Sequence, residues 1–244
     1  MKDRLKLINF VMIVAFIVSL LLAVANEFLK ERKNTNVRND KKESILGAVG
    51  IDTDAMTYDE MVTFFDQNIS EMIIDTFGNI IDGIDPKDLK WVEDKSNGRT
   101  MFLYDNKESP YLPIYYSSSP QGYIIPISGK GLWSTLKGYF AIGQDKNTAL
   151  GITFYKHKET SGLGGEVDKD WFQDQFTFNK NKKIFNDQGE LVSISLNQRK
   201  GTQGKKHEVD GISGATVTSK GLTNFLKSDL KRYEYFLKDS YVAE

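Results

Sequence analysis

The chain has 244 residues, which allow one anchored domain with a core of its own. Its net charge of −1 and the lack of an aromatic-studded basic stripe argue against a nucleic-acid partner. Because the chain has no cysteine, disulfides, thiolate-ligated iron–sulfur or zinc sites and cysteine nucleophiles are excluded for this chain.

The first feature is an apolar run, Leu7 to Ala25, whose only polar members are Asn9 and Ser19. At about 1.5 Å per residue the run matches the hydrocarbon core of a bilayer, so it predicts one membrane-spanning helix. A cleaved signal peptide is the alternative, since Ala23-Val24-Ala25 fits an A-x-A cleavage pattern, but the run is longer than a signal-peptide core. Basic residues flank both ends, and charge alone leaves the orientation open.

Composition then divides the chain into four parts. We expect residues 1–29 to form the amino terminus and anchor, 30–50 a charged linker, 51–120 the first part of a soluble domain and 121–244 its core. The elements in the last two parts mix helices with hairpins. The sequence therefore predicts an α+β fold, with a single amino-terminal transmembrane helix followed by one mixed domain.

The first helix predicted in the soluble part begins with a capping box, Thr57-Tyr58-Asp59-Glu60. Apolar residues follow at helical spacing and predict an amphipathic helix that ends near Gly78: Met61, Phe64, Phe65, Ile69, Met72 and Ile73.

Strands are predicted next. Short β-prone runs and two hairpins account for the middle of the chain: Met101–Tyr104; Tyr123–Ile127; Tyr139–Ile142 with Leu150–Tyr155; and Lys183–Asn186 with Leu191–Leu196, turning at residues 187–189. The final element is a helix from about Thr218 to Lys238. Its apolar residues lie near one face: Leu222, Phe225, Leu226, Leu230, Tyr233 and Leu237.

The stretch Asp210 to Gly221, DGISGATVTSKG, leads into that last helix. A helix amino terminus offers unpaired N–H groups and a positive dipole end, so a small-residue loop before it can hold a phosphate. Gly211 and Gly214 permit close approach, Ala215 adds little bulk, and hydroxyls come from Ser213, Thr216, Thr218 and Ser219. An ordinary N-cap by Thr216 or Thr218 behind a glycine turn explains the same pattern.

Other glycine-rich motifs are incomplete. The run Glu159 to Glu166, ETSGLGGE, would need glycine at position 167 to complete a dinucleotide fingerprint, and Val167 stands there. The sequence contains no Walker A loop and no G-x-S-x-G elbow. Direct binding of NAD or ATP is therefore disfavoured. His157 and His207 have no matching carboxylate motif, so we predict no metal site and no catalytic histidine.

Taken together, Asp210–Thr216 matches the motif at which a transferase links FMN covalently to threonine. Three further stretches resemble the anchored, FMN-carrying subunit of the sodium-translocating NADH:quinone reductase: Gly122–Ile127, Gly129–Ser134, and Gly151–Tyr155 continuing into Glu159–Glu166. The resemblance spans nearly the whole chain and is weakest from Asn34 to Pro120. One departure is Ser161, where the family pattern has proline, so a stiff φ angle is lost there.

This resemblance implies a function. Thr216 would carry FMN as a phosphoester, and the flavin would relay electrons within a six-subunit sodium pump of the bacterial inner membrane. The soluble domain would lie on the extracytoplasmic side. The NADH donor and the quinone acceptor would be handled by other subunits, and a flavin transferase would be a partner during maturation. Asp210 would be recognised by that transferase or would order the turn as an Asx cap.

The resemblance also implies flavin contacts. Ser213, Gly214, Ala215, Thr218 and Ser219 would surround the phosphate, and no catalytic side chain and no metal would be needed. The isoalloxazine ring would lie against the 159–166 loop, with these contacts: Thr160, Gly162, Leu163 and Gly164. Lys130 and Trp133 are weaker candidates, and the alternative for them is a surface lysine and a core tryptophan. Glu159 and Glu166 would be solvated or would cap loops.

Three alternatives stay open. The first is the corresponding flavin-carrying subunit of the related ion-translocating ferredoxin:NAD reductase, which shares the attachment motif. The run Gly129–Ser134 and the long segment before it favour the quinone reductase. The second is a stand-alone anchored flavin domain, and the third is a flavin-free, membrane-anchored interaction module.

Overall fold

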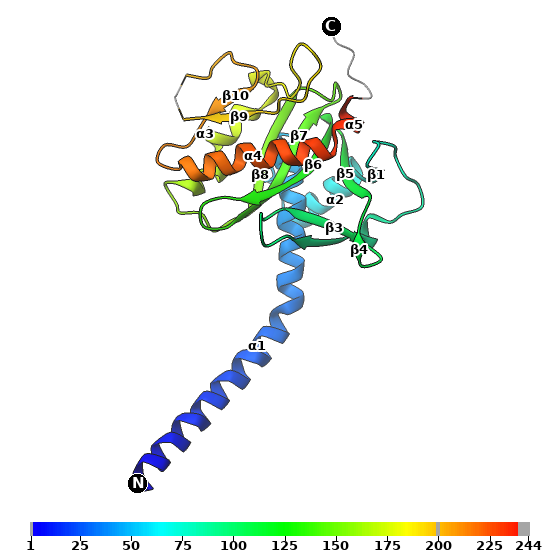
Figure 1. The fold of residues 1–244 in the computed structure, drawn as a ribbon. Helices are drawn as coiled ribbons and strands as arrows, with labels where there is room; N and C mark the ends of the chain where they lie inside the picture. Colours follow the sequence, from blue (N-terminus) through cyan, green and yellow to red (C-terminus); the bar gives the residue numbers. More distant parts are fainter. Residues whose placement is uncertain (1, 199–200, 239–244) are drawn as a thin grey trace. The chain divides into compact units, whose positions relative to one another are not determined.

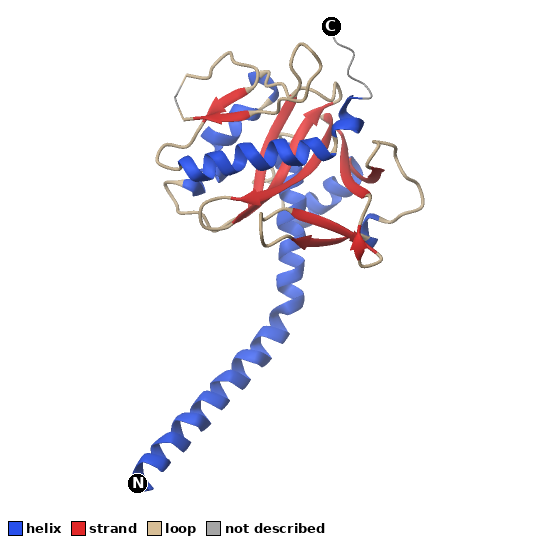
Figure 2. Cartoon of the chain, viewed as in Figure 1, coloured by secondary structure: helices blue, strands red, loops and turns tan. Residues whose placement is uncertain are grey.

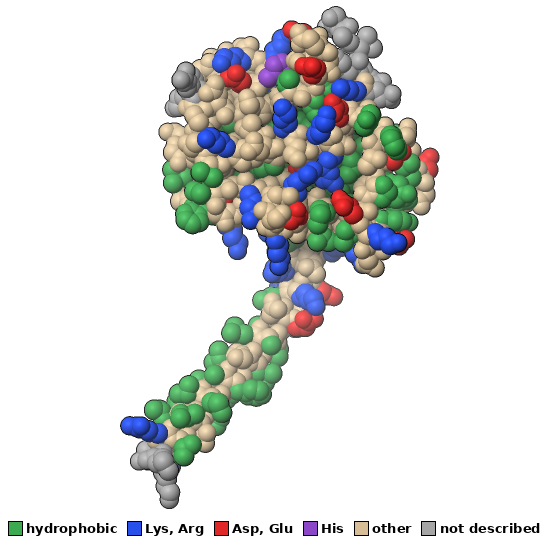
Figure 3. Space-filling view, in the orientation of Figure 1, with side chains coloured by type: hydrophobic (Ala, Val, Ile, Leu, Met, Phe, Trp, Pro, Cys, Tyr) green, Lys and Arg blue, Asp and Glu red, His purple; other side chains and the backbone are tan. Residues whose placement is uncertain are grey.

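The computed structural model describes residues 2–198 and 201–238, which fall into two compact units that divide between Asp40 and Lys41. The first unit is the greater part of one helix, α1 (Lys2–Ala48). Its apolar side chains between Leu7 and Val24 are exposed, and Figure 3 shows them as a hydrophobic surface along this helix. By length and composition α1 is able to cross a membrane.

The second unit mixes helices and strands, as the sequence predicted (Figures 1 and 2). Its α-helices are the end of α1, α2 (Tyr58–Asn68), α3 (Asp170–Gln173), α4 (Thr216–Arg232) and α5 (Glu234–Lys238). Short 3-10 helices are η1 (Pro86–Asp88), η2 (Gly164–Asp168), η3 (Asp174–Phe176) and η4 (Phe178–Lys180). The strands are β1 (Ile69–Asp75), β2 (Lys90–Glu93), β3 (Thr100–Tyr104), β4 (Lys107–Glu108), β5 (Tyr111–Ser118), β6 (Gln121–Lys130), β7 (Thr135–Gly143), β8 (Ala149–Lys156), β9 (Ser195–Asn197) and β10 (Glu208–Asp210).

Five of these strands form the central antiparallel sheet, in the order β1-β5-β6-β7-β8. The ladder between β6 and β7 is the longest, from Gly122↔Gly143 to Lys130↔Thr135. The strands β2, β3 and β4 make a separate small sheet, whereas β9 and β10 pair in parallel. The predicted strands at 101–104 and 123–127 and the hairpin of β7 with β8 are confirmed.

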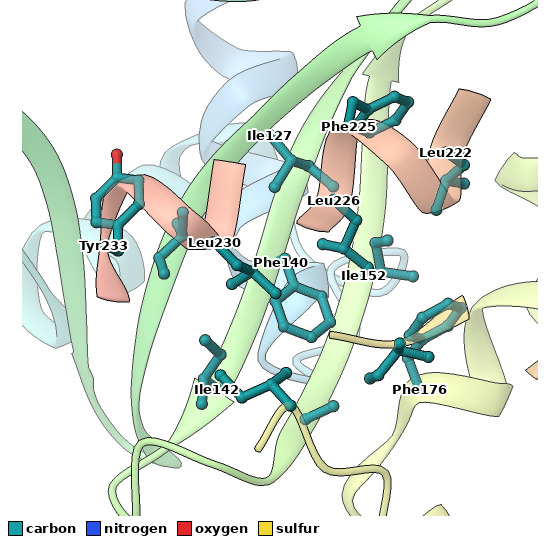
Figure 4. Packing of buried hydrophobic residues seen from close by; sticks show 14 of the residues in the cluster. Ile127, Phe140, Ile142, Ile152, Phe176, Leu222, Phe225, Leu226, Leu230 and Tyr233 are labelled. Carbon is teal, nitrogen blue, oxygen red and sulfur yellow. The ribbon is translucent and has the colours of Figure 1, made fainter. Parts of the chain in front are cut away.

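Both faces of the central sheet are covered, which explains why β6 and β7 are buried along most of their length. Helix α4 lies across one face (Figure 1), and its side chains pack onto the strands as Figure 4 shows. Members of this core include Ile127, Phe140, Ile142, Ile152, Phe176, Leu222, Phe225, Leu226, Leu230 and Tyr233. The other core joins the end of α1 and α2 to the opposite set of strand residues, such as Ile124, Tyr139 and Ala141.

The capping box at Thr57 is confirmed, but the helix that it begins is shorter than predicted. The Thr57 hydroxyl accepts from the Glu60 amide, and the Glu60 carboxylate accepts from the Thr57 amide. Helix α2 ends at Asn68 instead of near Gly78, and residues Ile69–Asp75 form β1. The prediction was wrong because apolar residues at 69, 72 and 73 suit both periodicities, and pairing with β5 decides between them.

Two further predictions need correction. The turn at residues 187–189 forms, but its flanks share a single bridge, Phe185↔Leu191, instead of a hairpin ladder. Strand β9 pairs with β10 from outside that predicted hairpin. The last helix starts at Thr216 and breaks at Tyr233, where the chain leaves helical geometry before α5 begins. The predicted buried residues of this helix lie in the core.

The predicted linker 30–50 also differs from the structure. It is helical as far as Ala48, and Ile45, Leu46 and Ala48 are buried. The hydroxyl of Ser44 donates to the hydroxyl of Thr153 on β8 at 2.8 Å. The last turns of the expected linker are therefore part of the core of the second unit.

Asp229 on α4 is a buried acid that ties the helix to the sheet. Its Oδ2 accepts from the Ser128 amide at 2.8 Å, and Oδ1 lies 3.6 Å from Arg99 Nε. Burial raises the pKa of Asp229 from 3.8 to about 6, although the Ser128 amide and the charges of Arg232 and Arg99 oppose the shift. Ionised Asp229 is therefore less stable in the folded chain than in the unfolded one.

We expect Asp229→Asn to become more stabilising, relative to wild type, as the pH rises from 4 to 7. An acid with a raised pKa stabilises the fold below its unfolded value, and this contribution of about 3 kcal/mol is lost as pH rises through about 6. The amide lacks this loss. Urea unfolding of both proteins at several pH values measures the difference. A difference that stays constant across that range would contradict the assignment.

Candidate functional site

The predicted loop before α4 forms a turn that presents Thr216 to solvent. Strand β10 ends at Asp210, Ile212 and Ala215 are buried as anchors, and Ser213 lies exposed between them. Gly214 has φ +74°, a left-handed conformation that favours glycine. Thr216 is the first residue of α4 and is exposed, and its hydroxyl donates to Gln198 Oε1 at 3.2 Å.

The amino terminus of α4 has no side-chain cap. Ala215 is the N-cap residue and offers no acceptor, so neither of the predicted N-caps, Thr216 and Thr218, forms. The first N–H groups of a helix have no partner within the helix, and they carry the positive end of its dipole. With 17 residues, α4 has the length for this dipole to develop. This end of the helix is suited to an anionic group.

Thr218 and Ser219 were predicted to contact the phosphate, but the structure gives both hydroxyls other partners. Thr218 is 1% exposed and donates to Glu159 Oε2 at 2.8 Å. Ser219 is fully buried, and its hydroxyl accepts from the Ile212 amide at 3.2 Å. Both side chains hold the loop in shape from the inside, whereas Ser213, Gly214 and Thr216 remain on its surface.

Glu159 connects the three motif stretches. Its Oε1 accepts from the amides of Trp133 (3.0 Å) and Ser134 (2.9 Å) and from the Ser134 hydroxyl (3.1 Å). Its Oε2 accepts from the Leu132 amide (3.0 Å) and the Thr218 hydroxyl (2.8 Å). Glu159 is buried, and its predicted loop-capping role is what the structure shows.

The same contacts control the charge of Glu159. Burial alone would raise the pKa of this carboxyl, but the hydrogen bonds from Thr218 and from the three backbone amides outweigh burial and lower it. Glu159 is therefore a carboxylate at neutral pH. Its negative charge stabilises the turn at residues 131–134 and the first turn of α4 together.

Close backbone approaches fix the same three segments. A Cβ on Gly164 would lie 2.6 Å from Thr218 Oγ1, and one on Gly221 would lie 2.2 Å from the Lys130 carbonyl oxygen. The two glycines let the 159–166 loop and strand β6 touch α4 directly. Lys130 itself is exposed. Trp133 is 72% exposed, so the alternative of a core tryptophan is excluded.

The predicted ring-contact loop lies against the motif loop. Leu163 is 42% exposed, and its Cδ2 lies 3.0 Å from the place where a Cβ on Gly214 would be. Gly162 has φ +77° and is exposed, and Thr160 is exposed as well. The carbonyl of Thr160 accepts from the amides of Leu163 and Gly165, which closes the loop. Gly164 is buried beneath it.

Asp210 orders a neighbouring loop. Its Oδ1 accepts from the Gly201 and Thr202 amides, both at 3.0 Å, and from the Thr202 hydroxyl at 2.8 Å. The Gln175 side chain bonds both the amide and the carbonyl of Asp210. Burial opposes ionisation of Asp210, but the hydrogen bonds from Thr202 and Gly201 prevail and lower its pKa. The turn-ordering role predicted for Asp210 thus has a structural basis.

A cavity of about 1060 Å³ opens beside the motif loop. Its lining comes from two stretches, residues 162–182 and 202–213, and includes Gly162, Trp171, Gln175, Lys182, Gly211 and Ser213. Trp171 is half exposed, and its Nε1 donates to Glu166 Oε2 at 2.9 Å. Lys182 is buried, and its Nζ donates to the carbonyl oxygens of Lys205 (2.8 Å) and Glu208 (2.6 Å).

Sequence reasoning missed Trp171, Gln175, Lys182 and Gln198 at this site. None belongs to a glycine-rich motif, and the chain folds them against Asp210–Thr216 only in three dimensions. Trp171 carried a weak signal, because a tryptophan amid polar residues follows directly after the loop. The two histidines have other contacts. His157 pairs with Asp168, and His207 Nδ1 lies 2.8 Å from the Lys183 carbonyl. In the described residues, no group of acidic or histidine side chains could hold a metal ion.

Comparison with known proteins identifies the family of the chain. Residues 131–231 match the model of the FMN-binding domain. The NqrC subunit of the Na(+)-translocating NADH-quinone reductase from Pseudomonas aeruginosa is 32% identical over 229 residues, covering 88% of this chain and 87% of that protein. The same subunit from Haemophilus ducreyi is 33% identical and covers 89% and 86%.

Solved structures agree with these sequences. The crystal structure of the same subunit from Parabacteroides distasonis aligns with a TM-score of 0.63 and 28% identity, covering 86% of this chain and 96% of that one. The crystal structure of NqrC from Shewanella oneidensis has a TM-score of 0.66 at 21% identity, with 84% and 98% covered, and shows the shared fold. The matched domain contains both the Glu159 contacts and the exposed Thr216. The chain belongs to the NqrC family of the Na(+)-translocating NADH-quinone reductase.

Proposed function

We propose that this chain carries FMN on Thr216 through a phosphoester and passes electrons within a sodium-translocating NADH:quinone reductase. The observation that carries the proposal is the position of the Thr216 hydroxyl. It is exposed, it begins an uncapped 17-residue helix, and it ends a loop with the flavin-attachment motif. The names of the relatives and the FMN-binding domain match support the same assignment.

The fit to a phosphate follows from the helix end. A phosphodiester on Thr216 would face the free amides of the first turn, and an anion there gains about 0.3–1 kcal/mol at an exposed position. Ser213 and the backbone at Gly214 and Ala215 are placed to contact it. Thr218 and Ser219 would act indirectly, by keeping the loop in shape.

The fit to the flavin ring follows from the adjacent surface. The cavity beside Ser213 has a volume suited to a cofactor-sized group, and Trp171 provides an aromatic wall. Leu163, over Gly214, offers an apolar contact, while Gly162 and Thr160 are exposed on the same loop. Lys130 and Trp133 lie on the turn that Glu159 holds and are candidates for its outer rim.

When bound, FMN would supply the redox chemistry, and the chain would hold and orient it. The residues of the site bind and shield: amides and Ser213 at the phosphate, the 159–166 loop at the ring, and Glu159 behind both. An ester bond keeps the cofactor attached where a dissociated one would be lost by dilution. We infer that electron donor and acceptor lie on other subunits, because this chain has no cysteine and no dinucleotide loop.

The membrane arrangement completes the proposal. Leu7–Ala25 would anchor the chain in the bacterial inner membrane by a single pass. The domain would lie on the extracytoplasmic side of a six-subunit complex. A flavin transferase would modify Thr216 during maturation, with Asp210 as part of the segment that it recognises.

Intact mass and peptide mapping of the protein from its native membrane test this proposal. We expect the mass of the chain increased by one FMN residue, with the increment on the peptide that contains Thr216 and with Leu7–Ala25 retained. A natively produced chain with unmodified Thr216, from cells with an active transferase, would refute the electron-carrier assignment. A mass that lacks the residues up to Ala25 would refute the anchor alone.

A further inference from the structure

Gln198 is the one side chain that contacts the hydroxyl of Thr216 in the described part of the chain. It follows β9, and its Oε1 accepts the Thr216 hydroxyl hydrogen at 3.2 Å from Oγ1. Its carboxamide lies over Gly211, where a Cβ would be 3.0 Å from Nε2. Gly211 therefore makes the space in which the Gln198 amide reaches Thr216.

Strand β9 holds this arrangement in place. The Gly211 amide donates to the Asn197 carbonyl at 2.7 Å, which fixes the segment containing Gln198 beside the motif loop. The Leu196 amide donates to the Thr223 hydroxyl on α4 at 3.0 Å. Gln198 is thus positioned from two sides, although its own side chain is exposed.

We propose that Gln198 is a positioning residue for flavin attachment: it orients the Thr216 hydroxyl before transfer and donates to the phosphate afterwards. This inference rests on the proposed function. In the transfer, Thr216 Oγ1 forms a bond to the phosphorus of the FMN half of FAD, and the phosphorus–oxygen bond to AMP breaks. AMP leaves, and the hydroxyl proton ends in solvent.

The two roles use the two ends of one carboxamide. Before transfer, Oε1 accepts the hydroxyl hydrogen, so the lone pairs of Oγ1 point away from Gln198 and are free to attack. After transfer, Oγ1 has no hydrogen, and Oε1 would face an anionic phosphodiester. A half-turn of the terminal torsion presents Nε2 as a donor instead, since a glutamine side chain has both groups.

Two substitutions separate these roles. Q198E keeps an acceptor for the hydroxyl but has no donor and repels the phosphodiester. Q198K donates to a phosphate but accepts no hydrogen from the hydroxyl. Gln144→Glu, on the exposed turn between β7 and β8, makes the same charge change away from the site and serves as the control.

The experiment uses the purified full-length chain in detergent, the transferase and FAD. We expect Q198E to be flavinylated about tenfold more slowly than wild type, because a hydrogen bond to a charged group is lost. The ³¹P resonance of its phosphodiester should shift, whereas Q198K should be slowed less than Q198E and Gln144→Glu should match wild type. Near-wild-type thermal unfolding of Q198E excludes misfolding as the cause.

The outcomes distinguish this inference from the function on which it rests. A wild-type rate for Q198E, or a ³¹P resonance equal to that of wild type, overturns the role of Gln198 while flavin attachment stands. Wild-type protein that takes up no flavin, or takes it up at another residue, overturns the attachment proposal itself.

Discussion

Protein with Thr216→Ala is expected to lose covalent flavin completely while keeping its fold. The substitution removes the one oxygen that would be esterified. Because Thr216 is exposed and makes a single side-chain hydrogen bond, to Gln198, we expect the free energy of unfolding to change by only about 0.5 kcal/mol. Fluorescence of the band in a denaturing gel, with intact mass and urea unfolding, measures both effects.

Two matched variants make this test specific. Thr216→Ser keeps a hydroxyl at the same place and should still be flavinylated, whereas Val217→Ala changes the next exposed residue and should be flavinylated as wild type. A fluorescent band in Thr216→Ala would place the flavin on another residue. A dark wild-type band from cells that contain the transferase would favour the flavin-free interaction module.

The sequence predicted most of the central sheet and the final helix because their signals are local. The hairpin of β7 and β8 and the apolar face of α4 follow from periodicity within each segment. Strand β5 was missed, since Pro113 argues against a strand interior. The structure accommodates Pro113 because residues 111–114 pair with β1 alone, and pairing with β6 starts at Tyr115.

The candidate site was predictable where a motif is continuous in sequence and not where contacts are long-range. The loop at 213–216 was identified from its own residues. The link from Glu159 to Thr218 joins positions 59 residues apart, and no local pattern shows it. Hydroxyls counted as phosphate ligands in a linear motif, those of Thr218 and Ser219, face the interior once the loop folds.

The contacts of Glu159 explain why two motif stretches without a bound phosphate recur beside the attachment loop. The turn at residues 131–134 presents its amides to this carboxylate, and Gly164 leaves room for the side chain to reach α4. The Glu159 carboxylate is therefore an internal anion that organises the loops, separate from any anion that Thr216 carries.

Glu159→Gln should destabilise the protein by about 3 kcal/mol at pH 7 and misplace the loop at residues 159–166. The carboxylate accepts five hydrogen bonds, whereas a carboxamide must point its NH₂ group at donors such as the Leu132 amide or the Thr218 hydroxyl. Buried donors left unpaired cost about 1–3 kcal/mol each. Glu166→Gln is the control, since its carboxylate accepts only from the half-exposed Trp171 indole and should change stability by less than about 0.5 kcal/mol.

The pH dependence gives this prediction a second, independent readout. Because the pKa of Glu159 is lowered in the folded chain, its carboxylate stabilises the fold above the unfolded value of 4.5, and that contribution is lost as pH falls through the folded pKa. The gap between wild type and Glu159→Gln should therefore narrow as urea unfolding is repeated from pH 7 down to pH 3. A gap that is small at pH 7, or that is equally large at pH 3, would show that the Glu159 carboxylate does not organise these loops.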